Sequence, residues 1–239
     1  MEMTFGEVKP RITTGGSFLY TRAAQRLAAR ATALDDLNGW RARDAVERED
    51  LENELLEVSL ATVITSYSAV EAAVNELYLE RAEFDRSVWF KGLSDELAMR
   101  LKSAWSEGVR KLNPIEKSKI ALSIAQVKDF DWGAGAAQSL GLLHDLRNAL
   151  VHHTPMTIVP GPSPSESQDA LERSLYTRFP TALIWGERNV TFRWAGCLGS
   201  GCAQWAATTA AGFQKEFFGA LECAYPSEGT LSQILDVRY

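Results

Sequence analysis

Apolar residues recur at helical spacing through most of this chain. Residues 17–37 contain neither Pro nor Gly, and Leu27, Ala31 and Leu34 lie three or four positions apart, which predicts an amphipathic helix. A longer helix is predicted over Arg48–Ala82, since one set of its apolar residues alternates four and three positions apart, as in the seam of a helical bundle. These seam residues are Val63, Tyr67, Val70, Val74 and Leu77.

The remaining helical segments have clear boundaries. Ser94 is placed to cap a helix that runs to Leu112, and Asn113-Pro114 breaks it. A shorter helix is expected over Ile115–Val127, followed by a turn at residues 131–133. Leucines form an apolar stripe over Gly135–His153, where Pro155 stops the helix. A last helix is expected over Cys202–Cys223.

Two segments depart from helical spacing. Residues 155–169 are rich in Pro, Ser and Gly without periodicity, which predicts a loop. Ala182–Trp185 and Val190–Trp194 favour β-structure and flank a short polar segment, which predicts a hairpin. We therefore expect an all-α helical bundle in one domain, 1–239. Its core spans about 17–153, with loop and hairpin elaboration over 154–198 and a final helix over 199–225.

Charge and composition exclude some functional classes. The 239 residues carry a net charge of −6, which argues against an indiscriminate nucleic-acid coat. Seven acids and one base lie between Asp44 and Glu57, so the rest of the chain is neutral in sum and leaves room for a basic patch. No apolar run approaches the ~20 residues of a membrane span, and residues 1–9 do not form a signal peptide. Three cysteines indicate a reducing compartment, so we expect a cytoplasmic protein.

All three histidines lie within ten consecutive residues, at His144, His152 and His153. On a helix, His144, Arg147, Asn148 and His152 share about 140° of the surface beside the leucine stripe. His152 and His153 also suit capping of the last helical carbonyls. A metal site fits less well, since Asn is a poor zinc ligand and no HExxH motif occurs. A third interpretation is acid–base chemistry on a phosphodiester, with histidine moving protons and arginine binding phosphate.

The segment Arg147-Asn148-Ala149-Leu150-Val151-His152 resembles the R-x4-6-H motif of the HEPN superfamily, in the form where Asn follows Arg. The earlier helix over Tyr67–Leu77, which carries Glu71 and Asn75, is similar to a core helix of these proteins. The resemblance covers about residues 17–153. It implies an all-α, typically dimeric bundle, and many members are metal-independent endoribonucleases, including toxins, antiphage effectors and RNA-processing enzymes.

The resemblance also implies roles for individual residues. Arg147 would hold the scissile phosphate, and His152 would act as general acid or base for attack by the 2′-hydroxyl. Asn148 would orient the phosphate or a catalytic group. Glu71 would support the site, paired with Arg147, and His153 would be a further supporting residue. His144 lies outside the motif.

We therefore expect a metal-independent endoribonuclease of toxin–antitoxin or antiphage type that uses no cofactor. Its expected partners are RNA, a second copy of the chain, and an antitoxin or nucleotidyltransferase, with no membrane. The alternative is a non-catalytic HEPN-like module that binds RNA or a partner protein. A plain helical scaffold, in which the histidines only cap a helix, is a third alternative.

Overall fold

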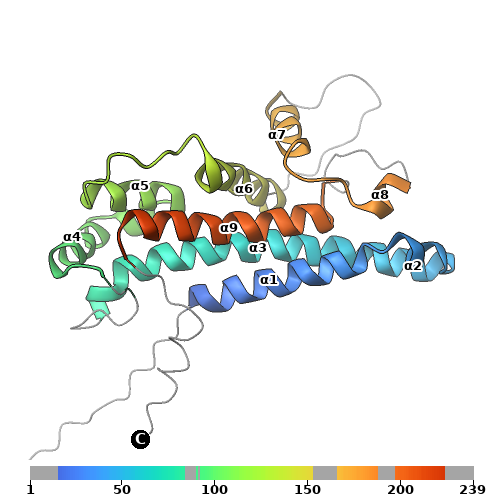
Figure 1. Ribbon diagram of the computed structural model, residues 1–239, viewed down its shortest axis with the longest axis horizontal. Helices are drawn as coiled ribbons and strands as arrows, with labels where there is room; N and C mark the ends of the chain where they lie inside the picture. Colours follow the sequence, from blue (N-terminus) through green and yellow to red (C-terminus); the bar gives the residue numbers. More distant parts are fainter. Residues whose placement is uncertain (1–15, 84–89, 91, 153–165, 188–196, 224–239) are drawn as a thin grey trace, which may run out of the picture.

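The computed structural model describes residues 16–83, 90, 92–152, 166–187 and 197–223, and in these residues the regular elements are helical (Figure 1). Apart from one short 3₁₀ turn at Val109–Lys111, they are α-helices. In chain order the α-helices are α1 (Gly16–Leu34), α2 (Leu37–Arg41), α3 (Ala45–Glu83), α4 (Asp95–Ser106), α5 (Pro114–Ile124), α6 (Gly135–Val151), α7 (Glu166–Tyr176), α8 (Leu183–Glu187) and α9 (Ser200–Ala220). The expected all-α class is confirmed for this part of the chain.

Side-chain caps set two of the predicted helix starts. The Ser94 hydroxyl accepts from the Leu97 N–H at 3.2 Å, as expected. The Asn113 side chain accepts from the Glu116 N–H at 2.9 Å, and the Glu116 carboxylate accepts in return from the Asn113 N–H at 3.2 Å. This reciprocal pair, with Pro114 at the first helical position, begins α5 one residue before the helix predicted from Ile115.

α4 is shorter than the expected helix over Ser94–Leu112. Gly108 has a φ of +124°, in the left-handed region that glycine adopts at little cost. The α-helix therefore ends at Ser106, and the chain continues in the 3₁₀ turn. α1 also ends early, at Leu34, and the separate helix α2 follows.

α3 is the central helix of the bundle. Its 39 residues span about 58 Å, with α1 and α9 packed along it and α4, α5 and α6 against its second half (Figure 1). The predicted seam is confirmed, since Val63, Tyr67, Val70, Val74 and Leu77 are all at most 3% exposed. α3 therefore supplies the surface on which the other helices are placed.

Two clusters of buried side chains lie along α3. The larger one joins α3 to α4, α5, α6 and α9, and it includes Leu140, Leu143 and Leu146 of the predicted leucine stripe. The smaller cluster joins α1, α2 and α8 to the first turns of α3 and α9. Since α3 and α9 contribute to both, the clusters belong to one continuous bundle.

The expected secondary structure after α6 is partly wrong. The strand predicted over Ala182–Trp185 is instead the helix α8, with Ile184 and Trp185 buried in the smaller cluster. The Trp185 Nε1–H donates to the carbonyl of Leu198 at 2.6 Å, so packing fixes this segment rather than strand propensity. The loop expected to reach Asp169 ends sooner, since α7 begins at Glu166. The second predicted strand, Val190–Trp194, lies outside the described residues.

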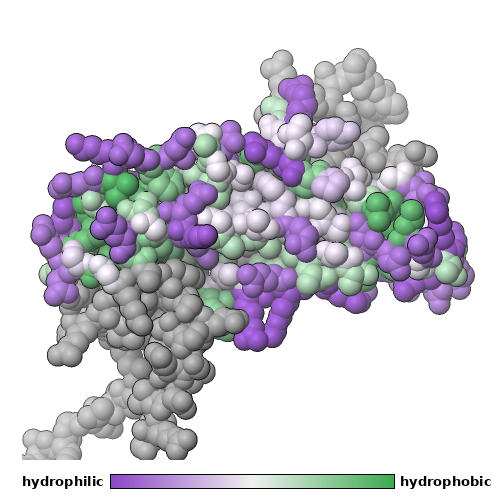
Figure 2. All heavy atoms as spheres, viewed as in Figure 1, coloured by the Kyte–Doolittle hydropathy of each residue, from purple (hydrophilic) through white to green (hydrophobic). Residues whose placement is uncertain are grey.

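The burial of α3 helps to decide whether it is a membrane-spanning helix or a core helix. The segment Ala45–Leu79 is long and apolar enough to cross a membrane by length and composition alone, with a mean hydropathy of 1.2 over its best window. However, 44% of that window is buried inside the bundle, and core helices of soluble proteins meet the same criterion. Figure 2 shows hydrophilic and hydrophobic residues mixed at both ends of the visible face, with a paler middle over α9. We therefore interpret α3 as a core helix.

Candidate functional site

The predicted site residues lie on the second half of α6, against the middle of α3. The leucine stripe of α6 faces the core, which brings His144 to the edge of the α3 interface. There the hydroxyl of Tyr67 lies 2.7 Å from Nδ1 of His144, and the two ring centroids are 5.4 Å apart. Tyr67 is 3% exposed. His144, which precedes the R-x4-H motif, is therefore held by its surroundings, whereas the side chain of His152 is exposed.

His144 is also bonded to Asn148, one turn later on α6. The amide nitrogen of Asn148 lies 3.0 Å from Nε2 of His144. On its other side, Asn148 accepts from Arg147 through Oδ1, at 3.0 Å from the guanidinium Nη1. Asn148 therefore links the predicted phosphate-binding arginine to a histidine, and this gives it a definite orientation.

The guanidinium of Arg147 also lies over the ring of Tyr67, with Cζ 5.6 Å from the ring centroid. A cation at this distance from an aromatic face is attracted by the ring's quadrupole. Arg147 is partly buried, so it keeps contact with solvent while its position is fixed from two sides. Tyr67, His144, Arg147 and Asn148 form a closed set of contacts, which we call the α3–α6 cluster.

Electrostatic surroundings keep Tyr67 a neutral phenol. Burial raises the pKa of Tyr67 well above its usual value of 10.0, and the nearby Glu71 carboxylate raises it further. The Arg147 guanidinium acts in the opposite direction, while Asp145 and Glu116 add smaller increases in the pKa. The Tyr67 hydroxyl can therefore donate or accept a hydrogen bond throughout the neutral pH range.

The expected ion pair between Glu71 and Arg147 is wrong. The salt bridges formed by described residues do not include this pair, and Arg147 instead contacts Asn148 and the Tyr67 ring. The negative charge of Glu71 instead raises the pKa of Tyr67 and the pKa of Lys117 of α5. Glu71 lies beside the α3–α6 cluster as a source of negative charge rather than as the partner of the arginine.

Lys117 is the unexpected charged residue of this region. It is 2% exposed, and its ammonium donates to Oδ1 of Asn75 at 2.8 Å. Nζ also lies 5.3 Å from the centroid of the Trp105 ring. Burial lowers the pKa of Lys117, and Glu71 offsets part of this effect. The predicted core helix with Glu71 and Asn75 thus meets a buried cation from α5, which the sequence analysis missed.

His152 lies at the other end of the predicted motif. It is the C-cap of α6, and its N–H donates to the carbonyl of Asn148 at 2.9 Å. Its side chain is exposed, beside Val151, which is 45% exposed. The structure thus places His152 on the same helix as Arg147 and Asn148 but outside the α3–α6 cluster. His153 lies outside the described residues.

The structure also describes the residues that a metal site would need, two of the cysteines and one of the tryptophans. Among the described residues no group of three or more His, Cys, Asp or Glu is arranged to bind a metal ion. Cys197 and Cys202 are buried and form no disulfide. Burial raises the pKa of Cys197 to about 12, with Glu172 adding to the increase. Trp185 is buried in the core, and Trp194 lies outside the described residues.

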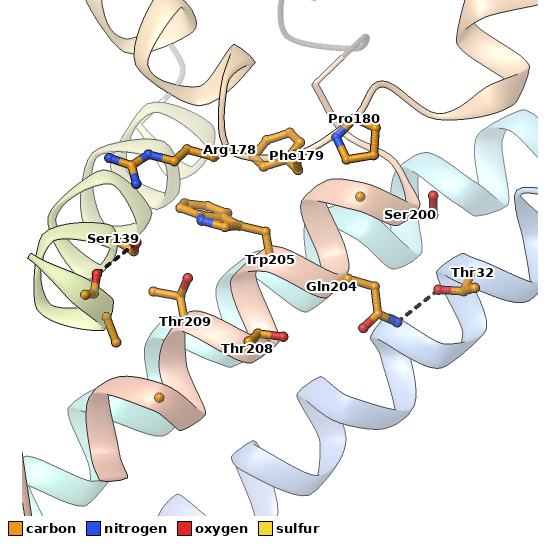
Figure 3. Close-up of a pocket in the computed structure, with 14 residues that line it drawn as sticks. Thr32, Ser139, Arg178, Phe179, Pro180, Ser200, Gln204, Trp205, Thr208 and Thr209 are labelled. Carbon is orange, nitrogen blue, oxygen red and sulfur yellow. Dashed lines mark hydrogen bonds between the residues drawn. The ribbon is translucent and has the colours of Figure 1, made fainter. Parts of the chain in front are cut away.

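A separate shallow groove of about 670 Å³ lies between α1, the start of α6, the segment before α8, and α9 (Figure 3). Phe179 and Trp205 form its aromatic side, with ring centroids 5.3 Å apart. Its polar groups are engaged with neighbouring residues, since Gln204 donates to Thr32 at 2.9 Å and Arg178 donates to Gln138 at 3.0 Å. We therefore assign this groove no ligand.

Comparison of the chain with protein-family models, with curated proteins and with solved structures gave no significant match. The functional argument therefore depends on the chemistry of the α3–α6 cluster and of His152.

Proposed function

We propose that this protein is a metal-independent endoribonuclease of the HEPN type, which cleaves RNA by attack of a 2′-hydroxyl. The observation that carries the proposal is the fixed position of Arg147, five residues before an exposed histidine at the end of the same helix. Its guanidinium is held by Asn148 and by the Tyr67 ring, yet it is not neutralised by a carboxylate. A cation with this arrangement is available to a phosphate.

The proposed chemistry moves one proton on each side of the phosphorus. A base takes the proton of the 2′-hydroxyl, the O2′–P bond forms, and the P–O5′ bond breaks. An acid gives a proton to the departing 5′-oxygen. The products are a 2′,3′-cyclic phosphate and a 5′-hydroxyl. His152 is the residue proposed for proton transfer, because histidine changes charge near neutral pH, and Arg147 would stabilise the charge on the phosphate.

One copy of the chain supplies these groups incompletely. Arg147 and His152 point about 140° apart on α6, so a single copy surrounds a phosphate poorly. A two-fold symmetric dimer would bring two copies of each group into one cleft and supply both an acid and a base. The exposed Val151 beside His152 gives this end of α6 an apolar contact for a second copy. We therefore propose a homodimer through this face, and a cytoplasmic role in a toxin–antitoxin or antiphage system with an antitoxin or nucleotidyltransferase as partner.

The test is cleavage of structured and unstructured RNAs in excess chelator, with product ends identified by mass spectrometry. We expect a 2′,3′-cyclic phosphate, and no cutting where the scissile nucleotide is 2′-deoxy. His152→Ala and Arg147→Ala should abolish cleavage. Arg110→Ala removes an exposed arginine of the 3₁₀ turn at Val109–Lys111, outside the α3–α6 cluster, and should leave cleavage unchanged.

Several outcomes would contradict the proposal. Full activity of His152→Ala, or cutting only with divalent metal, rules out the mechanism. Tight RNA binding without cleavage would favour the alternative function, a non-catalytic module that binds RNA. Sedimentation that shows an active monomer at micromolar concentration rejects the dimeric site.

A further inference from the structure

The α3–α6 cluster contains a chain of hydrogen bonds that begins at a group able only to donate. Arg147 has five N–H groups and no acceptor. Its Nη1 donates to Oδ1 of Asn148, so the amide nitrogen of Asn148 faces Nε2 of His144. The guanidinium therefore fixes which way the Asn148 amide points, because the reversed amide would set two donors against each other.

The orientation of Asn148 in turn fixes the protons on His144. The amide nitrogen of Asn148 is a donor, so Nε2 of His144 must accept with its lone pair. A neutral imidazole then carries its single proton on Nδ1, where it donates to the hydroxyl oxygen of Tyr67, 2.7 Å away. A doubly protonated imidazole would present a donor to the Asn148 amide and break the chain. One arrangement of protons satisfies every bond, and in it His144 is neutral with the proton on Nδ1.

Tyr67 closes this chain on itself. Its hydroxyl receives the bond from His144, while the face of its ring lies under the Arg147 guanidinium. Burial and the Glu71 carboxylate, which raise the pKa of Tyr67, keep the phenol neutral and able to accept. A change at Tyr67 or His144 is therefore transmitted to Arg147 by two routes, through the ring contact and through Asn148.

We infer that His144 and Tyr67 are positioning residues of the proposed RNA-cleaving site, in which a neutral, Nδ1-protonated His144 orients Asn148 so that Asn148 holds Arg147 toward the scissile phosphate. This inference rests on the proposed function. It assigns a task to the one histidine that lies outside the R-x4-H motif, and it makes the tautomer of that histidine a measurable property of the site.

The first experiment measures the tautomer without any substrate. Two-bond ¹H–¹⁵N correlation spectra report which ring nitrogen of each histidine carries a proton, and His144→Gln identifies the His144 signals by their loss. We expect a protonated Nδ1 and an unprotonated Nε2 at neutral and mildly alkaline pH. Tyr67→Phe, which removes the acceptor that faces Nδ1, should weaken this preference. Tyr78→Phe is the matched control, since Tyr78 is a buried tyrosine of the same helix whose hydroxyl donates elsewhere, to the Lys117 carbonyl at 2.7 Å.

The second experiment measures RNA cleavage. Tyr67→Phe should lower kcat by about tenfold or more with little change in KM, since misplacement of a group that acts on the transition state lowers the rate of the chemical step. Tyr78→Phe should leave kcat unchanged. A glutamine amide offers one donor and one acceptor, as the neutral imidazole does. His144→Gln should therefore retain more activity than His144→Leu, although both variants lack the ring.

The outcomes separate this inference from the proposed function. A wild-type His144 with its proton on Nε2 overturns the inference, as does a wild-type kcat in Tyr67→Phe or equal loss in His144→Gln and His144→Leu. A wild-type protein that cuts no RNA overturns the proposed function, and the positioning role falls with it. In that case the spectra still establish whether the hydrogen-bond chain exists.

Discussion

Lys117 donates a 2.8 Å hydrogen bond to Asn75 and so ties α5 to the middle of α3 with an ammonium that is 2% exposed. Burial lowers the pKa of Lys117 below its usual 10.5. Between the lowered pKa of the folded state and 10.5, the unfolded chain therefore binds more protons than the folded one. Stability contributed at this position must then rise with pH through that interval.

The prediction concerns Lys117→Met, which keeps the apolar stem and removes the charge. Relative to this variant, the wild type should gain unfolding free energy as the pH rises through the interval between the lowered pKa and 10.5. Urea denaturation at several pH values measures the difference. A difference that stays constant with pH, or one that shrinks, contradicts the assignment of a buried cation here.

A second prediction follows from the absence of an ion pair between Glu71 and Arg147. A buried pair would make Glu71→Gln cost about 3–5 kcal/mol, because it would leave the arginine stranded. Since Asn148 and Tyr67 hold Arg147 instead, we expect a loss of less than about 1 kcal/mol. Thermal melting of wild type and Glu71→Gln checks this, and a loss in the higher range would restore the pair.

Glu71→Gln should also change two pKa values, with signs set by the lost negative charge. Glu71 raises the pKa of Tyr67 and of Lys117, so both should fall in the variant. For Lys117 the interval over which stability rises with pH should widen downward. The urea series used for Lys117→Met measures this when it is repeated on Glu71→Gln, and an unchanged pH profile would show that the two groups do not interact.

Arg147→Lys separates charge from shape. Lysine keeps the cation but loses the planar, forked donors that bond Asn148 and stack on Tyr67. We expect kcat for RNA cleavage to fall by about tenfold or more, and unfolding free energy to fall by about 1 kcal/mol. Kinetics and melting of the one variant provide both values. Unchanged kcat in Arg147→Lys would mean that the site needs only a positive charge.

The cysteines give a prediction about reactivity. All three are buried and form no disulfide, and burial raises the pKa of Cys197 to about 12 and that of Cys202 well above 9.0. The thiolate is the reactive form, so the native protein should resist a thiol reagent at pH 8, whereas the protein in denaturant should react at three sites. Rapid labelling of the native protein would show that these thiols open to solvent.

The sequence was informative where a residue's role depends on its own helix. Alternation of Val63, Tyr67 and Val70 is enough to place them on a buried seam, and Ser94 caps the helix that it was expected to cap. The start of α5 at Pro114 could have been foreseen, because Asn113 and Glu116 have the spacing of a capping box.

Relationships between helices were harder to foresee. The sequence placed Glu71 and Arg147 near one seam, but the rotation of α6 relative to α3 decides whether they meet, and this rotation comes from packing. The sequence contained only a weak indication of the hydrogen bond between Tyr67 and His144, namely that a buried tyrosine hydroxyl needs a partner. α8 was mistaken for a strand because Ile184 and Trp185 favour strands locally, whereas their burial in the smaller cluster with residues of α1 and α9 selects a helix.

The central position of α3 has a consequence for the order in which the chain is made. α3 is complete at Glu83, but α9, which covers one of its faces, begins only at Ser200. α1 precedes α3 and can pair with it at once, yet the face that meets α9 waits through more than a hundred further residues of translation. Until then this apolar face of the emerging chain lacks its native cover. We therefore expect α3 to pack first against α1 and against α4, α5 and α6, and to complete its burial only when α9 has been made.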